Sequence, residues 1–240
     1  MIDYEKEVSG LAEDIKSAAG ANLISFVLYG SAAGGEYHGG HSDLNLLGVF
    51  NRLDADALTR LHPVVYLWTR KGHPAPLLLT LDELHSAADV FAIEFLDIRT
   101  RHRVLSGDDV FSQLEIPMDR HRHQVERELR VNLLRLRQAA LAAGAGDAEL
   151  GPILLGSIPA FATLFRHALL ALGVEPPEAR RESCRRLAAL LGFDAAPFDA
   201  VLDVREGKRP ERALDRGAFS AYLAAITAAV DAFDKRVDAS

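Results

Sequence analysis

The sequence predicts an α+β (α/β) fold, with a sheet and flanking helices in residues 1–112 and a helical bundle in residues 113–240. Short apolar runs punctuated by Gly, Pro and Asn recur before Gly107, as expected for strands alternating with helices. From Met118 onward these runs stop, and Ala, Leu and Arg dominate. The 240 residues, of which 49% are hydrophobic and 25% charged, are enough to form two folded lobes.

The chain begins with a predicted amphipathic helix that ends near Gly20 and packs on the sheet. Its apolar residues recur at helical spacing: Tyr4, Val8, Leu11 and Ile15. The apolar run Leu23–Tyr29 is short, contains aromatic residues and stops at Gly30, which favours a buried strand. Ser31 is placed to cap a short helix, and Asp43–Phe50 is predicted to be the second strand.

A helix is predicted after the second strand, starting at Asp54 or Asp56 and continuing through Trp68. Pro63 should kink or divide this helix, because proline removes a backbone donor. Tyr66 and Trp68 share the helix with other apolar residues, so we expect core packing for both rather than base stacking.

Two further strands and a helix are predicted before Gly107. Leu77–Leu79 is a short apolar run, and residues 80–83 have the pattern of a capping box for a helix that reaches about Ala88. The apolar run Phe91–Ile98 is predicted to be the next strand.

The second lobe is predicted to be entirely helical. Gly and Pro punctuation gives helices at residues 118–143, 148–172, 177–191, 197–205 and 216–236. The longest uncharged segment, Leu150–Phe165, is shorter than the roughly 20 residues of a membrane-spanning helix, so a buried bundle helix and no membrane contact are expected.

Composition narrows the classes of function. The net charge of −7 and the pI of about 5.7 give no sequence-independent attraction to phosphate backbones, so no direct nucleic-acid partner is expected. Cys184 is the only cysteine, which excludes an intrachain disulfide. The first ten residues lack the basic-then-apolar pattern of a signal peptide, and a cytoplasmic location is expected.

A polar cluster lies between the first two predicted strands. Asp43 and Asn45 are two residues apart in a strand, so their oxygens should project from the same face. Gly30 lets another group approach the backbone closely, and the helix start after Ser31 offers N–H groups to an anion. The combination suits a metal-bound polyphosphate.

This stretch resembles the nucleotidyltransferase superfamily, which includes polymerase beta, the minimal nucleotidyltransferases and the aminoglycoside nucleotidyltransferases. The signature of that superfamily is Gly-Ser, about ten residues, and Asp-x-Asp. Here Gly30-Ser31 is followed, after eleven residues, by Asp43-Leu44-Asn45. The residue-level resemblance covers Leu23 to about Gly107.

The resemblance implies a mixed sheet and a site in which Gly30 and Ser31 bind a nucleoside triphosphate. It also implies Mg, or Mn in its place, held by three acidic positions, while a substrate hydroxyl attacks the α-phosphate and pyrophosphate leaves. The third acidic residue is expected on a later strand, with Glu94 as the best match and Asp97 as the alternative. Apolar neighbours set Glu94 apart from a solvated glutamate.

Two departures from the pattern leave a second hypothesis open. Asn45 replaces the second carboxylate, and Ala32 and Ala33 stand where a basic residue often follows Gly-Ser. A nucleotidyltransferase would use Asp43, Asn45 and Glu94 as catalytic and metal-binding residues toward an unknown hydroxyl acceptor. The alternative is a catalytically degenerate nucleotide-binding or antitoxin-like module, which would pair as a homodimer or with a helical protein partner.

For several other polar residues, a structural role is an alternative to a functional one. Arginines of residues 118–137 should mostly form a solvated or lobe-bridging face, although Arg127 or Arg130 is a candidate phosphate ligand. His38 and His41 are expected to be solvated loop residues rather than metal ligands. Ser31 could be a simple helix N-cap and Asp43 a polar strand start.

Overall fold

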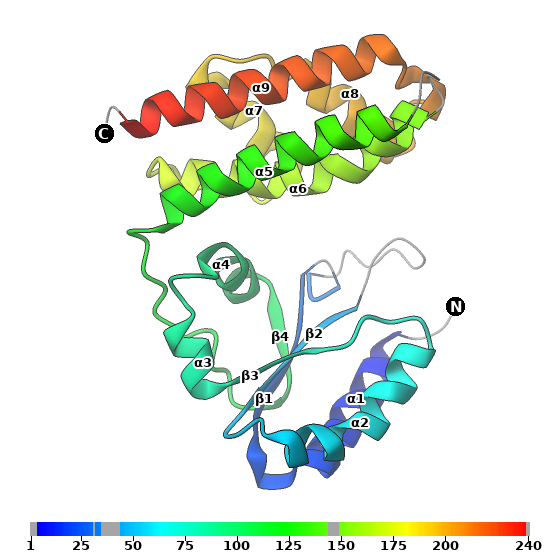
Figure 1. Ribbon diagram of the computed structural model, residues 1–240, viewed down its shortest axis with the longest axis vertical. Helices are drawn as coiled ribbons and strands as arrows, with labels where there is room; N and C mark the ends of the chain where they lie inside the picture. Colours follow the sequence, from blue (N-terminus) through cyan, green and yellow to red (C-terminus); the bar gives the residue numbers. More distant parts are fainter. Residues whose placement is uncertain (1–3, 31, 35–43, 144–148, 239–240) are drawn as a thin grey trace. The chain divides into compact units, whose positions relative to one another are not determined.

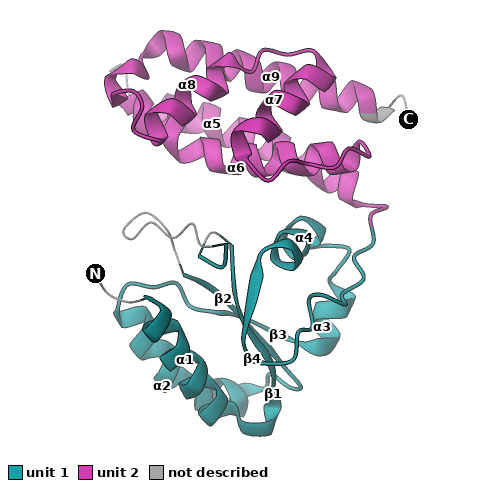
Figure 2. Ribbon diagram, turned by 180° about the vertical axis from the view of Figure 1, so that it is seen from behind, with its two compact units in different colours: residues 1–117 teal, residues 118–240 magenta. Residues whose placement is uncertain are grey.

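The computed structural model describes residues 4–30, 32–34, 44–143 and 149–238. The chain divides into two compact units, residues 1–117 and 118–240 (Figure 2). The change in composition predicted a boundary at residues 112/113, and the division lies between Pro117 and Met118.

Unit 1, residues 1–117, is built around a four-stranded mixed sheet with the strand order β3-β2-β1-β4. Strand β1 pairs antiparallel with β2 and β4, whereas β2 and β3 are parallel. The mixed sheet with flanking helices agrees with the predicted fold class. The elements are α1 (Tyr4–Ala19), the 3-10 turn η1 (Gly20–Asn22), β1 (Leu23–Tyr29), β2 (Asn45–Phe50), α2 (Ala55–Arg70), β3 (Leu77–Thr80), α3 (Leu81–Ser86), α4 (Ala92–Thr100) and β4 (His102–Gly107).

Helices α1 and α2 cover one face of the sheet (Figure 1). The predicted apolar stripe of α1 is buried there, with Val8 and Ile15 fully inaccessible to solvent. They pack in one cluster with Phe26 and Leu28 of β1 and with Leu46 of β2. Helix α1 therefore packs on the sheet, as its periodicity predicted.

The opposite face of the sheet packs against α3 and α4 (Figure 1). Val27, Leu47 and Val49 of the strands are buried here, together with Phe95 and Ile98 of α4. Because successive strand side chains point to opposite faces, β1 and β2 each contribute to both cores.

Helix α2 begins at one of the two predicted caps and is continuous. The Asp54 carboxylate accepts a 2.8 Å hydrogen bond from an N–H of the first turn. Pro63 lies inside the helix without dividing it. Trp68 is buried and donates to the carbonyl of Pro74 at 2.9 Å, which confirms core packing. The same prediction is wrong for Tyr66, which is 50% exposed.

The capping box at residues 80–83 is confirmed. The Thr80 hydroxyl accepts a bond from the Glu83 N–H at 3.1 Å, and the Glu83 carboxylate accepts one from the Thr80 N–H at 2.7 Å. These two bonds fix the start of α3 directly after β3. The strand predicted at Leu77–Leu79 is present as β3, which extends by one residue to Thr80.

The strand predicted at Phe91–Ile98 is wrong, because this segment forms α4. Its buried residues are spaced three and four apart, which is a helical period: Ala92, Ile93, Phe95, Leu96 and Ile98. The next strand is β4, which the sequence patterns do not predict. Its ends are polar, and only Val104 and Leu105 are strongly apolar, so it lacks the composition of a buried strand.

Unit 2, residues 118–240, is helical throughout its described elements, as predicted. Helix α6 packs against its four neighbours in the bundle. The elements are α5 (His121–Ala142), α6 (Leu150–Ala171), α7 (Arg180–Leu191), α8 (Ala196–Arg205), the 3-10 turn η3 (Glu211–Ala213) and α9 (Arg216–Asp238).

The apolar helix α6 forms the centre of this bundle. Among the described helices it alone is long and apolar enough to cross a membrane, judged by length and composition. Leu154, Ile158 and Phe165 on this helix are fully buried inside unit 2, so the bundle itself accounts for its composition. Cys184 of α7 is also buried, and burial raises the pKa of its thiol to about 12.

Candidate functional site

The candidate site begins where β1 ends. Tyr29, the last residue of β1, pairs with Asn45, the first residue of β2. Gly30 follows with φ of +79°, in the left-handed region that glycine adopts without strain. Its N–H donates to the carbonyl of Arg101 at 3.0 Å, and its carbonyl accepts from the N–H of Gly34 at 3.2 Å. The glycine turn is thus hydrogen-bonded on both sides.

Several predicted site residues lie outside the described part of the chain: Ser31, His38, His41 and Asp43. Residues 32–34, which follow Ser31, form a turn. The nucleotide-binding role of Ser31 and the metal-binding role of Asp43 stay predictions.

Asn45 lies on the face of the sheet that packs against α4. Its neighbours Leu44 and Leu46 are buried in the opposite core, and Leu47 faces the same side as Asn45. The amide nitrogen lies 3.5 Å from the position that a Cβ on Gly30 would occupy. The Asn45 side chain therefore lies over the glycine turn. Strand β2 begins at Asn45 rather than at the predicted Asp43, and the projection of Asp43 and Asn45 from one face stays a prediction because Asp43 lies outside the described residues.

Glu94 and Asp97 lie on α4, not on a strand. They are three residues apart, so a single helical face carries both, and both line the same pocket. Glu94 is exposed despite its apolar neighbours, since those neighbours occupy the buried face of the helix. No described residue forms a hydrogen bond or ion pair with the Glu94 carboxylate.

Tyr29 is a site residue that the sequence reasoning did not identify. Burial raises the pKa of its hydroxyl, and the negative charge of Glu94 raises that pKa further. Tyr29 thus connects the two halves of the site, because it is paired with Asn45 and electrostatically coupled to Glu94. The feature of the sequence that could have identified Tyr29 was its position at the end of a predicted strand, directly before Gly30.

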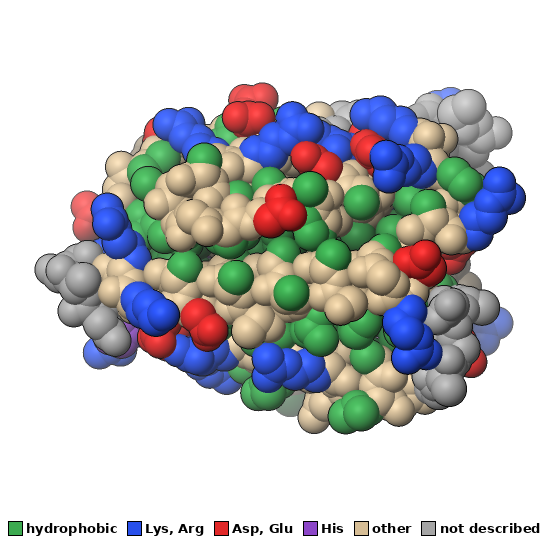
Figure 3. All heavy atoms as spheres, turned by 90° about the horizontal axis from the view of Figure 1, so that it is seen from above, with side chains coloured by type: hydrophobic (Ala, Val, Ile, Leu, Met, Phe, Trp, Pro, Cys, Tyr) green, Lys and Arg blue, Asp and Glu red, His purple; other side chains and the backbone are tan. Residues whose placement is uncertain are grey.

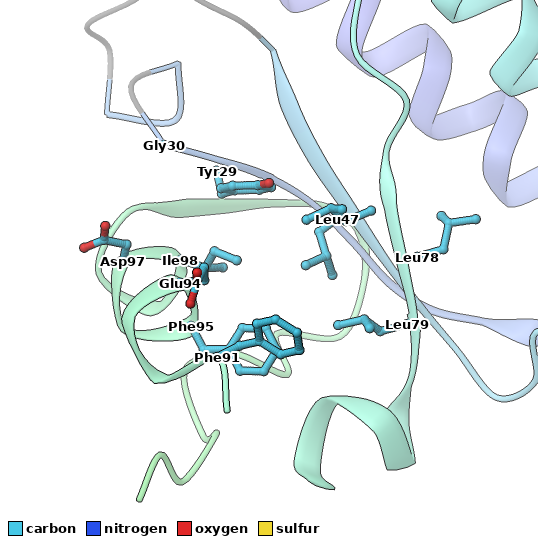
Figure 4. Close-up of a pocket in the computed structure, with 11 residues that line it drawn as sticks. Tyr29, Gly30, Leu47, Leu78, Leu79, Phe91, Glu94, Phe95, Asp97 and Ile98 are labelled. Carbon is cyan, nitrogen blue, oxygen red and sulfur yellow. The ribbon is translucent and has the colours of Figure 1, made fainter. Parts of the chain in front are cut away.

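A pocket of about 410 Å³ opens between the sheet and α4 (Figure 4). Its walls are largely apolar, and its carboxylates come from α4. In Figure 4 the Tyr29 ring lies on one side of the pocket, and Phe91 and Phe95 lie on the other. The lining residues are Tyr29, Gly30, Leu47, Leu77, Leu78, Leu79, Phe91, Glu94, Phe95, Asp97 and Ile98.

The metal-binding prediction rests on oxygen ligands. Asn45 and Glu94 supply an amide and a carboxylate oxygen, which are the donor types that Mg²⁺ prefers. Within residues 4–30, 32–34, 44–143 and 149–238, no group of three or more His, Cys, Asp or Glu residues could hold a metal ion. The donor chemistry fits Mg, and the ligand set Asp43, Asn45 and Glu94 stays a prediction.

Arg127 and Arg130 belong to unit 2, on α5, and both already contact carboxylates. Arg127 binds Glu128 at 2.6 Å, and Arg130 binds Glu126 at 2.9 Å and Asp234 at 2.7 Å. A phosphate bound by either arginine would compete with these partners.

The surface charges visible in Figure 3 are mixed in sign. Lys and Arg side chains are interspersed with Asp and Glu on the face shown, without a continuous basic band.

No protein-family model matches the chain, and no curated protein matches its sequence. A structural match exists with spectinomycin adenyltransferase AAD(9) from Enterococcus faecialis, in a crystal structure with ATP and spectinomycin. The TM-score is 0.54 at 12% sequence identity, and the match covers 92% of this chain and 99% of that chain. This chain therefore has the nucleotidyltransferase fold.

Proposed function

We propose that this chain, folded as a nucleotidyltransferase, moves a nucleoside monophosphate from a nucleoside triphosphate to a hydroxyl group of a small molecule or protein. One observation carries the proposal: Gly30 and Glu94 line the same pocket and the Asn45 amide lies over Gly30, in a fold shared with a protein crystallised with ATP. The similarity in fold supports the class of reaction.

Each predicted site residue has its own role in the proposed reaction. Gly30 lets the triphosphate approach the backbone closely, and Ser31 would contact the phosphates. Asp43, Asn45 and Glu94 would hold Mg, or Mn, which neutralises charge on the phosphates when bound. The acceptor oxygen forms a bond to the α-phosphorus while the bond from that phosphorus to the bridging oxygen breaks. Pyrophosphate leaves, and the hydroxyl proton passes to a carboxylate of α4.

Incubation with α-labelled nucleotides, Mg or Mn and a panel of hydroxyl acceptors tests this function. Labelled product and stoichiometric pyrophosphate are expected. The control is Glu94→Gln, which keeps the size of an exposed side chain while removing its charge, and which should abolish transfer without loss of folding. Absence of pyrophosphate release across the whole panel would contradict the enzyme proposal.

The second candidate is a degenerate module that binds nucleotide without turnover, and Asn45 is the observation that favours it. An amide carries no charge, so one negative charge is missing where two cations would be held. Such a module would act through a homodimer or a helical protein partner.

Asn45→Asp separates the two candidates. If wild type binds a triphosphate and only the variant releases pyrophosphate, the chain is a degenerate module. If wild type itself releases pyrophosphate, it is an enzyme. Binding is measured by thermal shift, because a ligand at 100 times its dissociation constant adds about 2.7 kcal/mol to the free energy of unfolding.

A further inference from the structure

The pocket between the sheet and α4 has more apolar surface than a phosphate or metal site needs. Leu47 and Leu79 from the strands and Phe91 and Phe95 from the α4 segment line it. In Figure 4 the Tyr29 ring lies on the opposite side of the space from the two phenylalanine rings. A volume of about 410 Å³ between aromatic and leucine walls is within the range of small-molecule sites.

One end of this pocket is negative. Glu94 lines it without a hydrogen bond or ion pair to any described residue, and its charge acts on the Tyr29 hydroxyl. A carboxylate accepts hydrogen bonds, so it suits a ligand O–H. Without a bound metal, the same charge repels an anionic ligand placed beside Glu94.

We infer that this pocket binds the acceptor of the reaction, and that the acceptor is an uncharged apolar alcohol whose hydroxyl points to Glu94. The inference rests on the proposed function for the transfer step and on the pocket alone for binding. The alcohol oxygen becomes the new ester oxygen on the α-phosphorus, its proton goes to Glu94, and pyrophosphate leaves.

The pocket fits an apolar alcohol better than a nucleobase. A base carries several ring nitrogens and exocyclic groups, and each one buried without a partner costs free energy. Leucine and phenylalanine side chains offer those groups no hydrogen bonds. An aromatic alcohol instead buries its ring between the walls and needs only one polar partner.

Binding is tested first, without nucleotide, by isothermal titration of the whole protein with 2-(2-naphthyl)ethanol. The matched ligands are 2-naphthylacetate, which has the same ring with a carboxylate, and glycerol, which has hydroxyls without apolar surface. The alcohol is expected to bind at least 10-fold more tightly than either. Equal or tighter binding of the acetate would overturn the inference.

Two leucine variants locate the binding. Leu77→Asp adds charge at the pocket, where Leu77 is 55% exposed, and Leu67→Asp adds the same charge on α2 at a leucine that is 65% exposed and does not line the pocket. Both exposed sites should tolerate aspartate. Leu77→Asp should weaken alcohol binding at least 10-fold, and Leu67→Asp should leave it unchanged. An equal effect of both, or none from Leu77→Asp, would overturn the inference.

Nucleotide titrations distinguish the pocket from the proposed function. If Leu77→Asp weakens triphosphate binding as much as alcohol binding, the pocket holds the nucleobase and the inference is wrong. If the alcohol binds in a Leu77-dependent way but no triphosphate binds or reacts, the pocket inference stands for binding and the proposed function fails. Transfer to spectinomycin or glycerol, without naphthyl alcohol binding, would preserve the function and refute the acceptor class.

Discussion

At the scale of single residues, the site depends on a glycine that no other residue replaces without cost. Gly30 combines a positive φ with hydrogen bonds on both sides and with the Asn45 amide packed above it. The amide is at ordinary van der Waals distance from the place where the methyl group of an alanine would lie, so an alanine would not collide with Asn45. The penalty for substitution comes from the backbone alone.

Gly30→Ala is expected to lower the free energy of unfolding of unit 1 by about 1–2 kcal/mol, the cost of a left-handed L-residue. Urea denaturation followed by the fluorescence of Trp68, the only tryptophan, measures this change. The control is Gly10→Ala on α1, where the space around the added methyl is empty. Because alanine favours helix, that variant should gain about 0.5–1 kcal/mol. Equal stabilities of the two variants would contradict the left-handed backbone conformation of Gly30.

At the scale of secondary-structure elements, α4 and β4 are tied together by His102. Its Nδ1 donates to the carbonyl of Ile98 at 2.9 Å, and its Nε2 lies 2.9 Å from the carboxylate of Asp109. Asp109 also accepts bonds from the N–H of Ser112 at 3.0 Å and from its hydroxyl at 2.5 Å. The Ser112 hydroxyl, followed by other partners including His102, lowers the pKa of Asp109 to about 2.

This pKa predicts how the stability of unit 1 depends on pH. Asp109 titrates near 3.8 when unfolded and near 2 when folded, so its stabilisation is complete above about pH 5 and declines as the pH falls toward 2. Because the side chain is 42% exposed, we expect only about 1 kcal/mol from it. Urea unfolding of Asp109→Asn and wild type from pH 7 to 2.5 should show a difference that shrinks with acid.

The neighbouring Asp108 provides the control for this measurement. Its side chain forms no hydrogen bond with the described residues, so Asp108→Asn should differ little from wild type at any pH. A difference between Asp109→Asn and wild type that stays constant down to pH 2.5 would rule out the carboxylate as its source.

The elements also show where sequence reasoning succeeds and where it fails. Turn and cap residues such as Asp54 and Thr80 have local effects, so the starts of α2 and α3 were predictable. Segment 91–98 was ambiguous, because a short apolar run fits a buried strand as well as a buried helix. The spacing of Glu94 and Asp97, three residues apart, was the available sign of a helix.

The site itself was predictable only in part. Gly30 and Asn45 could be placed together because strand alternation and glycine turns follow local rules. The apolar pocket could not, because it depends on how β3 and α4 meet Leu47 across the sheet, and such long-range packing is not visible in local patterns. Tyr29 was likewise missed, since its role depends on Glu94, 65 positions further along the chain.

At the scale of the whole molecule, each unit has its own buried core. Trp68 belongs to the core of unit 1, and Leu154 is fully buried in unit 2. Separate cores allow separate unfolding transitions. If the units unfold separately, a two-state model does not describe the unfolding of the whole chain.

Leu154→Ala tests whether the units unfold separately. Removing a fully buried leucine side chain should cost unit 2 about 2–5 kcal/mol. We expect the far-ultraviolet circular dichroism transition, to which the helices of unit 2 contribute, to move to lower urea, while the Trp68 fluorescence transition stays in place. A matched control is Leu47→Ala, fully buried in unit 1, which should move the fluorescence transition. Movement of the fluorescence transition in Leu154→Ala would mean that the units unfold together.

The reactivity of the buried cysteine of α7 offers a direct measure of how often unit 2 opens. The Cys184 thiol is 1% exposed, and burial raises its pKa to about 12, so it is protonated at neutral pH. It therefore reacts with disulfide reagents only after the helices around it open. The rate at which Cys184 is labelled therefore reports the opening equilibrium of the bundle, in native buffer and without denaturant. Since the chain has no second cysteine, all labelling occurs at Cys184 and reports opening of unit 2. If added nucleotide or alcohol slows the labelling, its binding stabilises unit 2 against opening.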